Sequence, residues 1–231
     1  EEPEDLVART LAFFAPKPLA GKRALVTSGP THEPIDPVRV MANRSSGQQG
    51  QAIASALAAA GAEVTLVTGP VNLPQPPGMT VVPVQTADQM LAAAQAALPA
   101  DIAVFAAAVA DWKPKTTATE KLKKVGGQDE LSMSFVKNPD ILATIAQAGH
   151  RPALVVGFAA ETENVVANAQ GKLARKNADW IVANDVSGGA VFGEQTNTVT
   201  LVSAQEAEAW PTLTKDQVAE RLVQKIVESL P

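Results

Sequence analysis

The sequence predicts an α/β protein with a Rossmann-like, mostly parallel sheet covered by helices on both faces. Short apolar segments alternate with longer Ala-rich or amphipathic segments, which is the pattern of repeated strand–helix–strand units. The apolar segments contain few polar residues, as expected for strands that are buried on both faces of a parallel sheet. The chain has 231 residues, of which 46% are hydrophobic and 19% charged, enough for one large domain of this class.

Each expected element has a local signal. Gly61 suits the C-terminal cap of an Ala-rich helix, Thr86 suits the N-terminal cap of the next helix, and Pro139 suits the first turn of a third. The expected strands are 21–29, 63–68, 79–84, 102–108, 152–159 and 180–183. The expected helices are 46–60, 86–98, 138–148, 162–177 and 214–230.

The rest of the chain divides into a few irregular segments. Residues 1–14, which begin with Glu rather than Met, are expected to form a short amphipathic helix, and we interpret residues 1–19 as the remnant of a linker to an absent upstream domain. Residues 20–231 are expected to fold as one domain. Within it we expect a Pro-rich loop at 30–41, a Lys-rich flap at 111–137 and a small late β-hairpin at 190–203.

The composition excludes several classes of function. The chain has no cysteine, which excludes disulfides, thiolate nucleophiles and Cys-ligated metals, and its two histidines exclude a His-rich metal site. A net charge of −5 argues against general binding to nucleic acid. No apolar run is long enough for a transmembrane helix. An anionic ligand would therefore have to meet a local cluster of basic residues.

The expected topology also predicts where a ligand binds. In open parallel sheets, ligands bind beyond the carboxyl ends of the strands. Small or polar residues occupy these ends, which we expect to converge on one rim. They are residues 28–29, 68–69, 107–108, 158–159 and 183–184.

The loop after the first strand carries donors suited to an anion. Arg39 offers a two-pronged guanidinium for phosphate or carboxylate, and Asn43 can both donate and accept hydrogen bonds. Residues 45–47 (Ser-Ser-Gly) precede the Ala-rich helix, whose N-terminus favours an anion. Two plainer alternatives stay open: Arg39 pairs with Asp36 or Glu33, and the glycines only allow the helix to pack closely on the sheet.

Other polar and aromatic residues follow later strands. Asp111 could accept hydrogen bonds from ribose hydroxyls or hold a metal ion, and Phe158 offers a face for stacking. Lys172 and Lys176 are four residues apart and so lie on one face of a helix. A flap with many cations suits triphosphate binding, although a solvated charged loop is the plainer alternative. The flap lysines are Lys113, Lys115, Lys121, Lys123, Lys124 and Lys137.

A nicotinamide-dependent reductase is the main alternative function. Gly47 and Gly50 before an Ala-rich helix resemble a dinucleotide-binding loop. However, they lie about 18 residues after the first strand, and the second strand ends without an acid to hold a ribose 2′-hydroxyl. The chain also has no Tyr for the Tyr-Lys pair of a short-chain dehydrogenase. A non-catalytic nucleotide-binding module is a third hypothesis.

Taken together, the motifs resemble the phosphopantothenoylcysteine synthetase family, which forms one half of bifunctional coenzyme A biosynthesis proteins. They occur in family order from about residue 20 to the end of the chain. The matching segments are 29–31, Glu33, 36–39, Asn43, 45–47, 106–111, 120–124, 137–142, 157–162, 172–177, 183–185, Phe192 and Asn197.

The resemblance implies a two-step ligation in the cytoplasm. The carboxylate of 4′-phosphopantothenate would attack the α-phosphate of CTP, giving an acyl-cytidylate and pyrophosphate. The amine of L-cysteine would then displace CMP. Mg²⁺, carried mainly by the triphosphate, would offset its charge. The resemblance also implies a homodimer, with an upstream decarboxylase domain in the full-length protein. We expect no FMN in this chain, and no nucleic-acid or membrane partner.

The resemblance also assigns roles to residues. Lys121 would stabilise charge on the phosphates, Asn43 would hold the acyl-cytidylate, and Arg39 and Ala108 would contact the acid substrate. The hairpin around Val191 and Val199 is the predicted dimer surface. The residues expected to bind the nucleotide are Ser45, Ser46, Gly47, Asp111, Lys121, Pro139, Asp140, Ile141, Leu142, Phe158, Lys172 and Lys176.

Overall fold

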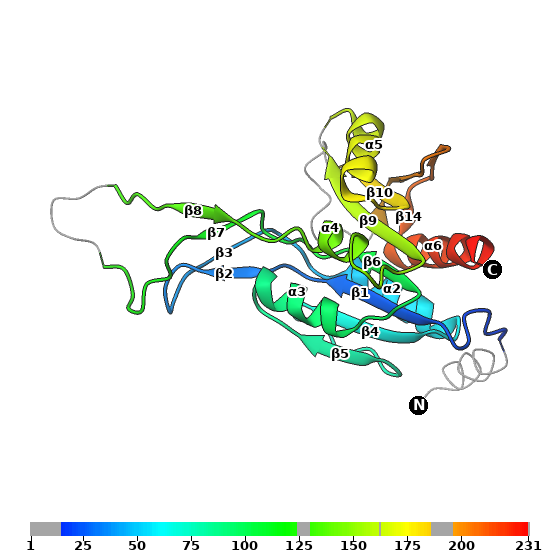
Figure 1. The fold of residues 1–231 in the computed structure, drawn as a ribbon, viewed down its shortest axis with the longest axis horizontal. Coiled ribbons are helices and arrows are strands. Elements are labelled where there is room, and N and C mark those ends of the chain that lie inside the picture. Colours follow the sequence, from blue (N-terminus) through cyan, green and yellow to red (C-terminus); the bar gives the residue numbers. More distant parts are fainter. Residues whose placement is uncertain (1–14, 124–129, 162, 186–195, 231) are drawn as a thin grey trace.

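One eight-stranded sheet organises the computed structural model, which describes residues 15–123, 130–161, 163–185 and 196–230. Its strands are β1 (Arg23–Ser28), β4 (Glu63–Thr68), β5 (Thr80–Pro83), β6 (Ile102–Phe105), β9 (Leu154–Glu161), β10 (Trp180–Asp185), β12 (Val199–Val202) and β13 (Ala207–Ala209). Their order across the sheet is β13-β12-β10-β9-β6-β1-β4-β5 (Figure 1). Strands β1, β4, β5, β6, β9 and β10 are mutually parallel. At one edge, β12 pairs antiparallel with β10, and β13 pairs antiparallel with β12. The predicted mostly parallel sheet is confirmed.

Helices cover both faces of the sheet, as predicted. They are α2 (Gln48–Ala59), α3 (Ala87–Ala96), α4 (Ile141–Ala146), α5 (Val165–Lys176) and α6 (Lys215–Ser229). Successive residues of β1 point to opposite faces: Val26 joins one buried cluster, with α2 and α6, and Leu25 joins the other, with α3, α4 and α5. No helix within the described residues is both long and apolar enough to cross a lipid bilayer.

The starts of three helices are fixed by side-chain caps. The hydroxyl of Thr86 accepts a hydrogen bond from a backbone N–H of α3, as predicted, and Thr214 does the same for α6. In α4 the cap is Asp140, whose carboxylate accepts from the N–H of Ala143 (3.1 Å). Pro139 therefore precedes the cap rather than lying in the first turn, which corrects the predicted start of this helix.

Two hairpins, which the sequence did not predict, extend from the sheet and form an arm. They are β2 (His32–Pro34) with β3 (Val40–Ala42), and β7 (Trp112–Pro114) with β8 (Phe135–Lys137). The two hairpins run together away from the sheet (Figure 1). We call the described parts of residues 32–42 and 112–137 the arm. The predicted Pro-rich loop and Lys-rich flap are thus two paired hairpins with their connecting loops.

The predicted hairpin at 190–203 is placed differently. Residues 186–195 lie outside the described residues. The described hairpin joins β12 to β13, and β11 (Thr196–Asn197) pairs separately with β14 (Leu213–Thr214). Val199 pairs with Asn184 of β10 and is 2% exposed, because β12 lies within the sheet and its apolar side chains enter the core. Val199 is therefore not on a free surface, as the predicted dimer contact required.

The strand order reverses between β1 and β6. From β1 the chain moves to β4 and β5 on one side, then returns to β6, β9 and β10 on the other. A reversal of this kind opens a crevice between the diverging connections beyond the carboxyl ends of the two central strands. The fold itself thus provides a binding site there.

Candidate functional site

A cavity of about 920 Å³ lies at this reversal point. Its lining includes Thr27 near the end of β1, the residues that follow β6, Phe158 of β9 and Asn184 of β10. The predicted rim is correct for residues 107–108, 158–159 and Asn184, but not for 28–29, since Thr27 lines the cavity in their place. It is wrong for residues 68–69, which do not line the cavity, because β4 lies on the far side of β1 from the reversal.

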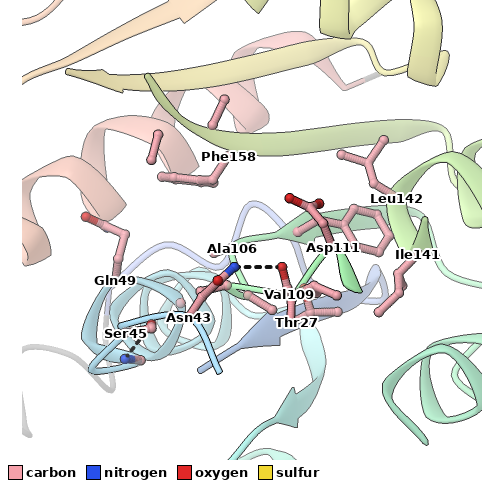
Figure 2. Close-up of a pocket in the computed structure, with 18 of the residues that line it drawn as sticks. Thr27, Asn43, Ser45, Gln49, Ala106, Val109, Asp111, Ile141, Leu142 and Phe158 are labelled. Atoms are coloured by element: carbon pink, nitrogen blue, oxygen red, sulfur yellow. Dashed lines mark hydrogen bonds between the residues drawn. The ribbon is translucent and has the colours of Figure 1, made fainter. Parts of the chain in front are cut away.

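Asn43 and Val109 join the two roots of the arm beside the cavity. Asn43 Nδ2 donates a hydrogen bond to the carbonyl oxygen of Val109 (2.9 Å), drawn as a dashed line in Figure 2. Both residues line the cavity, and Phe158 lies across from them. The Asn43 side chain is thus held at the cavity, with its oxygen left to meet a ligand.

The start of α2 forms one end of the cavity. Gly47, its N-terminal cap, has a φ of 76°, a conformation that residues with a side chain disfavour, and the nearby Ser46 Oγ accepts from the N–H of Gln48 (3.4 Å). Gly50 lies against β1: a Cβ there would stand 2.5 Å from Ser28 Oγ. Ser28 Oγ in turn donates to the carbonyl oxygen of Gly47 (2.9 Å). The alternative in which glycine allows the helix to pack closely on the sheet is therefore correct for Gly50. This close packing holds the positively polarised end of α2 at the cavity.

The start of α4 forms the opposite end. In Figure 2, Ile141 and Leu142 lie at one side of the cavity, and Ser45 and Gln49 at the other. Asn138 Nδ2 donates to the carbonyl oxygen of Ala110 (2.8 Å), which ties this turn to the segment after β6. An apolar surface beside backbone and amide groups suits the flat face and polar edge of a base.

Two lysines of α5 reach the cavity and are paired with carboxylates. Lys172 Nζ lies 2.6 Å from Glu161 Oε1, and Lys176 Nζ lies 3.3 Å from Asp140 Oδ2. Both lysines are half-buried and line the cavity, so they are not merely solubilising surface residues. Asp140 thus both caps α4 and positions Lys176.

A polar network that the sequence reasoning missed occupies the α2 end. Lys215, the first residue of α6, donates from Nζ to Gln48 Oε1 (2.9 Å). Gln49 Nε2 donates to the carbonyl oxygen of Lys215 (3.0 Å), and Asn197 Nδ2 donates to Gln49 Oε1 (2.8 Å). All four residues line the cavity. One sequence signal could have revealed Lys215, because it occupies the same stripe as the apolar residues of α6.

Arg39 and Lys121 are not at the cavity. A guanidinium nitrogen of Arg39 lies 2.6 Å from Asp36 Oδ2, so the alternative in which Arg39 pairs with Asp36 is correct. The same nitrogen donates to the carbonyl oxygen of Leu122 (3.0 Å). Asp36 also accepts from the N–H of Leu122 (3.1 Å). The hydrogen bond from Arg39, with those from backbone N–H groups, holds the pKa of the Asp36 carboxyl well below its usual range. Lys121, next to Leu122, is therefore held at the arm's outer part.

The remaining predicted residues meet at one place. Apart from Arg39 and Lys121, every residue to which the resemblance assigns a role in binding or transforming a ligand lines this cavity. They are Asn43, Ser45, Ser46, Gly47, Ala108, Asp111, Pro139, Asp140, Ile141, Leu142, Phe158, Lys172 and Lys176.

The described residues offer little for a resident metal ion. They contain no group of three or more His, Asp or Glu side chains placed to hold one. Asp111 and Asp140 are the carboxylates among the described cavity residues, and Asp140 is paired with Lys176. The donor set fits a divalent cation that arrives with a phosphate ligand, with Asp111 as its protein contact.

Comparison with known families identifies the fold and its lineage. Residues 19–230 match the DNA/pantothenate metabolism flavoprotein C-terminal domain family. The chain belongs to this family. The family resemblance predicted from the motifs is thereby confirmed.

Curated relatives of this family are longer than the chain. The coenzyme A biosynthesis bifunctional protein CoaBC of Vibrio cholerae is 46% identical over 231 residues, which cover 99% of this chain and 58% of the relative. The protein of the same name from Escherichia coli K12 is 45% identical, over 98% of this chain and 57% of the relative. The chain thus spans a little over half the length of these relatives.

A solved structure agrees with this family assignment. The crystal structure of the C-terminal domain of a coenzyme A biosynthesis bifunctional protein CoaBC superposes with a TM-score of 0.76 and 40% identity. The alignment covers 92% of this chain and 97% of that domain.

Proposed function

We propose that the chain is a phosphopantothenate–cysteine ligase that uses CTP in coenzyme A biosynthesis. The proposal rests chiefly on membership of this domain family, with 46% identity to a coenzyme A biosynthesis protein over nearly the whole chain. A second support is that thirteen predicted site residues, which lie far apart in the sequence, line one cavity. In the full-length protein, a decarboxylase part would precede this chain, and the proposed place of action is the cytoplasm.

The cavity suits the proposed first step. The base would lie at the α4 end, near Ile141 and Leu142, and the phosphates would extend toward the start of α2. A carboxylate oxygen of the acid substrate then bonds to the α-phosphorus, while the bond between the α-phosphorus and its bridging oxygen breaks and pyrophosphate leaves. Mg²⁺ bound with the nucleotide would supply charge neutralisation. Lys172 and Lys176, each paired with a carboxylate, would donate hydrogen bonds on the base side of the phosphates.

The second step uses the same position. The amine of cysteine bonds to the acyl carbon, the bond from that carbon to the CMP oxygen breaks, and the amine loses a proton. Asn43 lies on the cavity wall with Nδ2 held by Val109, so its Oδ1 can accept from the amine or its amide can orient the acyl group. Small side chains at 106–108 leave room for the acyl chain.

We also propose that the active form is a homodimer in which the arm of one copy reaches the cavity of the other. Lys121 and Arg39, which the resemblance places in the reaction, lie on the arm and not at the cavity of their own chain. The arm also carries exposed apolar side chains, which a second copy would cover. Among the described residues, the exposed large hydrophobic side chains are Val38, Val40, Trp112, Leu131, Phe135 and Val166, and all but Val166 belong to the arm.

A pyrophosphate assay tests the ligase. Pyrophosphate should appear with CTP, Mg²⁺ and 4′-phosphopantothenate before cysteine is added, and CMP should follow its addition. ATP in place of CTP is the matched control and should give much less pyrophosphate. If CTP binds but no pyrophosphate forms with the acid present, the chain is a binding module and the ligase proposal is wrong.

A thermal-shift measurement separates the ligase from the reductase. CTP should raise the unfolding temperature, whereas NADPH should not. The family relationship gives no support to the reductase, and the chain lacks both the acid expected at the end of the second strand and any tyrosine. Stabilisation by NADPH alone would reverse this conclusion.

A further inference from the structure

Lys215 is a buried cation at the cavity whose charge is not balanced by a carboxylate. Its residue exposure is 9%, although it begins a helix whose other buried residues are apolar. Nζ donates to the neutral oxygen of Gln48, and within the described part of the chain no acidic side chain lies within ion-pair distance of it. Burial lowers the pKa of Lys215. A buried charge of this kind is unfavourable unless an anion joins it.

The surroundings hold Lys215 in place rather than neutralise it. Gln49 Nε2 binds the carbonyl oxygen of Lys215, and Asn197 holds the other end of the Gln49 amide. Gln48 and Gln49 are the first two residues of α2, so the same contacts bring the ammonium to the N-terminal end of this helix. A cation and a positively polarised helix end thus meet at one end of the cavity.

The other cations of the cavity are arranged differently. Lys172 and Lys176 are paired with carboxylates, and Arg44 and Lys137 are exposed. Among the described cavity residues, Lys215 is therefore the buried cation available to an incoming anion. Its carbonyl oxygen binds Gln49, which lies on the side of the cavity opposite the apolar α4 end that would take the base (Figure 2).

We infer that Lys215 and the first turn of α2 form a diphosphate site, which holds the two terminal phosphates of the nucleotide and then the departing pyrophosphate. The assignment to a nucleotide rests on the proposed function, whereas the diphosphate site itself rests on the geometry. When the bond to the bridging oxygen breaks, its electron pair stays on the β-phosphate side, and the ammonium balances that negative charge by hydrogen bonding. Lys215 gives up no proton in this step.

Binding of inorganic pyrophosphate tests this site directly. Titration calorimetry on the intact chain with Mg²⁺ should show that Lys215→Met lowers the affinity for pyrophosphate and for CTP by about 10- to 100-fold, because a charge-assisted contact is lost. CMP, which lacks both terminal phosphates, should bind the variant within about twofold of the wild type. Lys225→Met, on the same helix but away from the cavity, should leave all three affinities unchanged.

Stability distinguishes a ligand site from a structural lysine. Methionine fits an apolar helix face, and it removes an unbalanced buried charge, so Lys215→Met should unfold at the same temperature or higher. Lys215→Arg should keep part of the pyrophosphate affinity. Unchanged pyrophosphate affinity in the Met variant, or an equal loss of CMP affinity, would overturn the inference.

The outcomes also separate this inference from the proposed ligase. Lys215-dependent binding of pyrophosphate without its release from CTP and the acid substrate would support the site and refute the ligase. Pyrophosphate release by Lys215→Met with unchanged KM for CTP and unchanged inhibition by pyrophosphate would refute the site alone.

Discussion

The cavity and the arm are built on different principles. Cavity residues such as Phe158 and Asn184 are placed by the ends of parallel strands, which the sheet's hydrogen bonds and core hold in register. Arg39 and Leu122 are instead held by local contacts to one carboxylate, Asp36. The sheet thus fixes the positions of the cavity residues, whereas the arm carries residues that can serve a site elsewhere.

Mixing two inactive variants gives the sharpest test of this difference. Lys121→Gln should lower the rate of pyrophosphate release by at least about 100-fold, because it removes a charge from the phosphates. Asn43→Asp should form the acyl-cytidylate but fail to convert it to the amide with cysteine. If the arm serves the partner's cavity, an equimolar mixture allowed to exchange subunits should recover about a quarter of wild-type activity, since half the dimers are mixed and each has one intact site.

The same mixture can contradict the exchange of arms. If Lys121 served the cavity of its own chain, every site in a mixed dimer would lack one residue and no activity would return. A chain that stays monomeric by analytical ultracentrifugation while turning over substrate would also rule out the exchange. Lys121→Gln should unfold at the wild-type temperature, and Asn43→Asp should lose only about 1 kcal/mol of stability with its hydrogen bond to Val109, so neither loss of activity would be one of folding.

Asp36→Asn should separate the arm from the sheet. The carboxylate accepts hydrogen bonds from Arg39 and from the N–H groups of Val38 and Leu122, so its loss should let the outer arm move. We expect kcat/KM to fall by about 10- to 100-fold through misplacement of Lys121, with CTP affinity nearly unchanged. Glu63→Gln, an exposed acid-to-amide control on β4, should leave both quantities unchanged. A matching loss of CTP affinity in the Asp36 variant would show that the arm also holds the nucleotide end of the cavity.

A pair of Gly→Ala variants tests how rigidly the sheet holds α2. Gly50→Ala puts a methyl group 2.5 Å from Ser28 Oγ, so it should destabilise the fold by about 1–3 kcal/mol and weaken CTP binding as α2 shifts. Gly171→Ala has open space within α5 and should stabilise by about 0.5–1 kcal/mol. Chemical denaturation gives both values. Equal effects would mean that contact with β1 does not position α2.

The smallest expected effect is a dependence of the arm on pH. Because the folded pKa of Asp36 is lowered, its contribution to stability is present above the carboxyl's ordinary unfolded pKa of about 4 and is lost as pH falls through the folded value. Amide exchange at Leu122 and Val38, corrected for intrinsic rates, should therefore be protected near pH 6 and lose protection only well below pH 4. Asp36→Asn should lack this dependence, and a loss of protection already at pH 5–6 in the wild type would contradict the lowered pKa.

The sequence was informative wherever one residue or period decides a structure. Thr86 predicts the start of α3 because a threonine hydroxyl can replace a helix hydrogen bond, and the buried run of β6 predicts a central strand. Strand ends then predict the cavity, since parallel strands deliver their carboxyl ends to one edge. Ala108 and Phe158 line the cavity for this reason, and the other eleven of the thirteen predicted residues that line it lie on the loops and helices between strands.

The features that escaped prediction depend on contacts between distant segments. The arm strands are three residues long and carry His32, Pro34 and Lys113, so no apolar alternation marks them. That Asp36 captures both Arg39 and Leu122 depends on how two hairpins meet. Lys215 could have been noticed from its place on an apolar stripe, but its contact with Gln48 requires the packing of α6 on α2.

The hydrogen bond from Asn43 to Val109 has a practical consequence for redesign. It joins the end of the first arm segment, after β3, to the chain that precedes the second, before β7, so we expect the two segments to be exchangeable as a unit. Grafting the corresponding segments from another member of the family between residues 31 and 43, and between 111 and 138, should change the surface of the arm while the α4 end of the cavity keeps its structure. Substitutions that change which second copy the arm contacts can therefore accumulate independently of substitutions in the cavity.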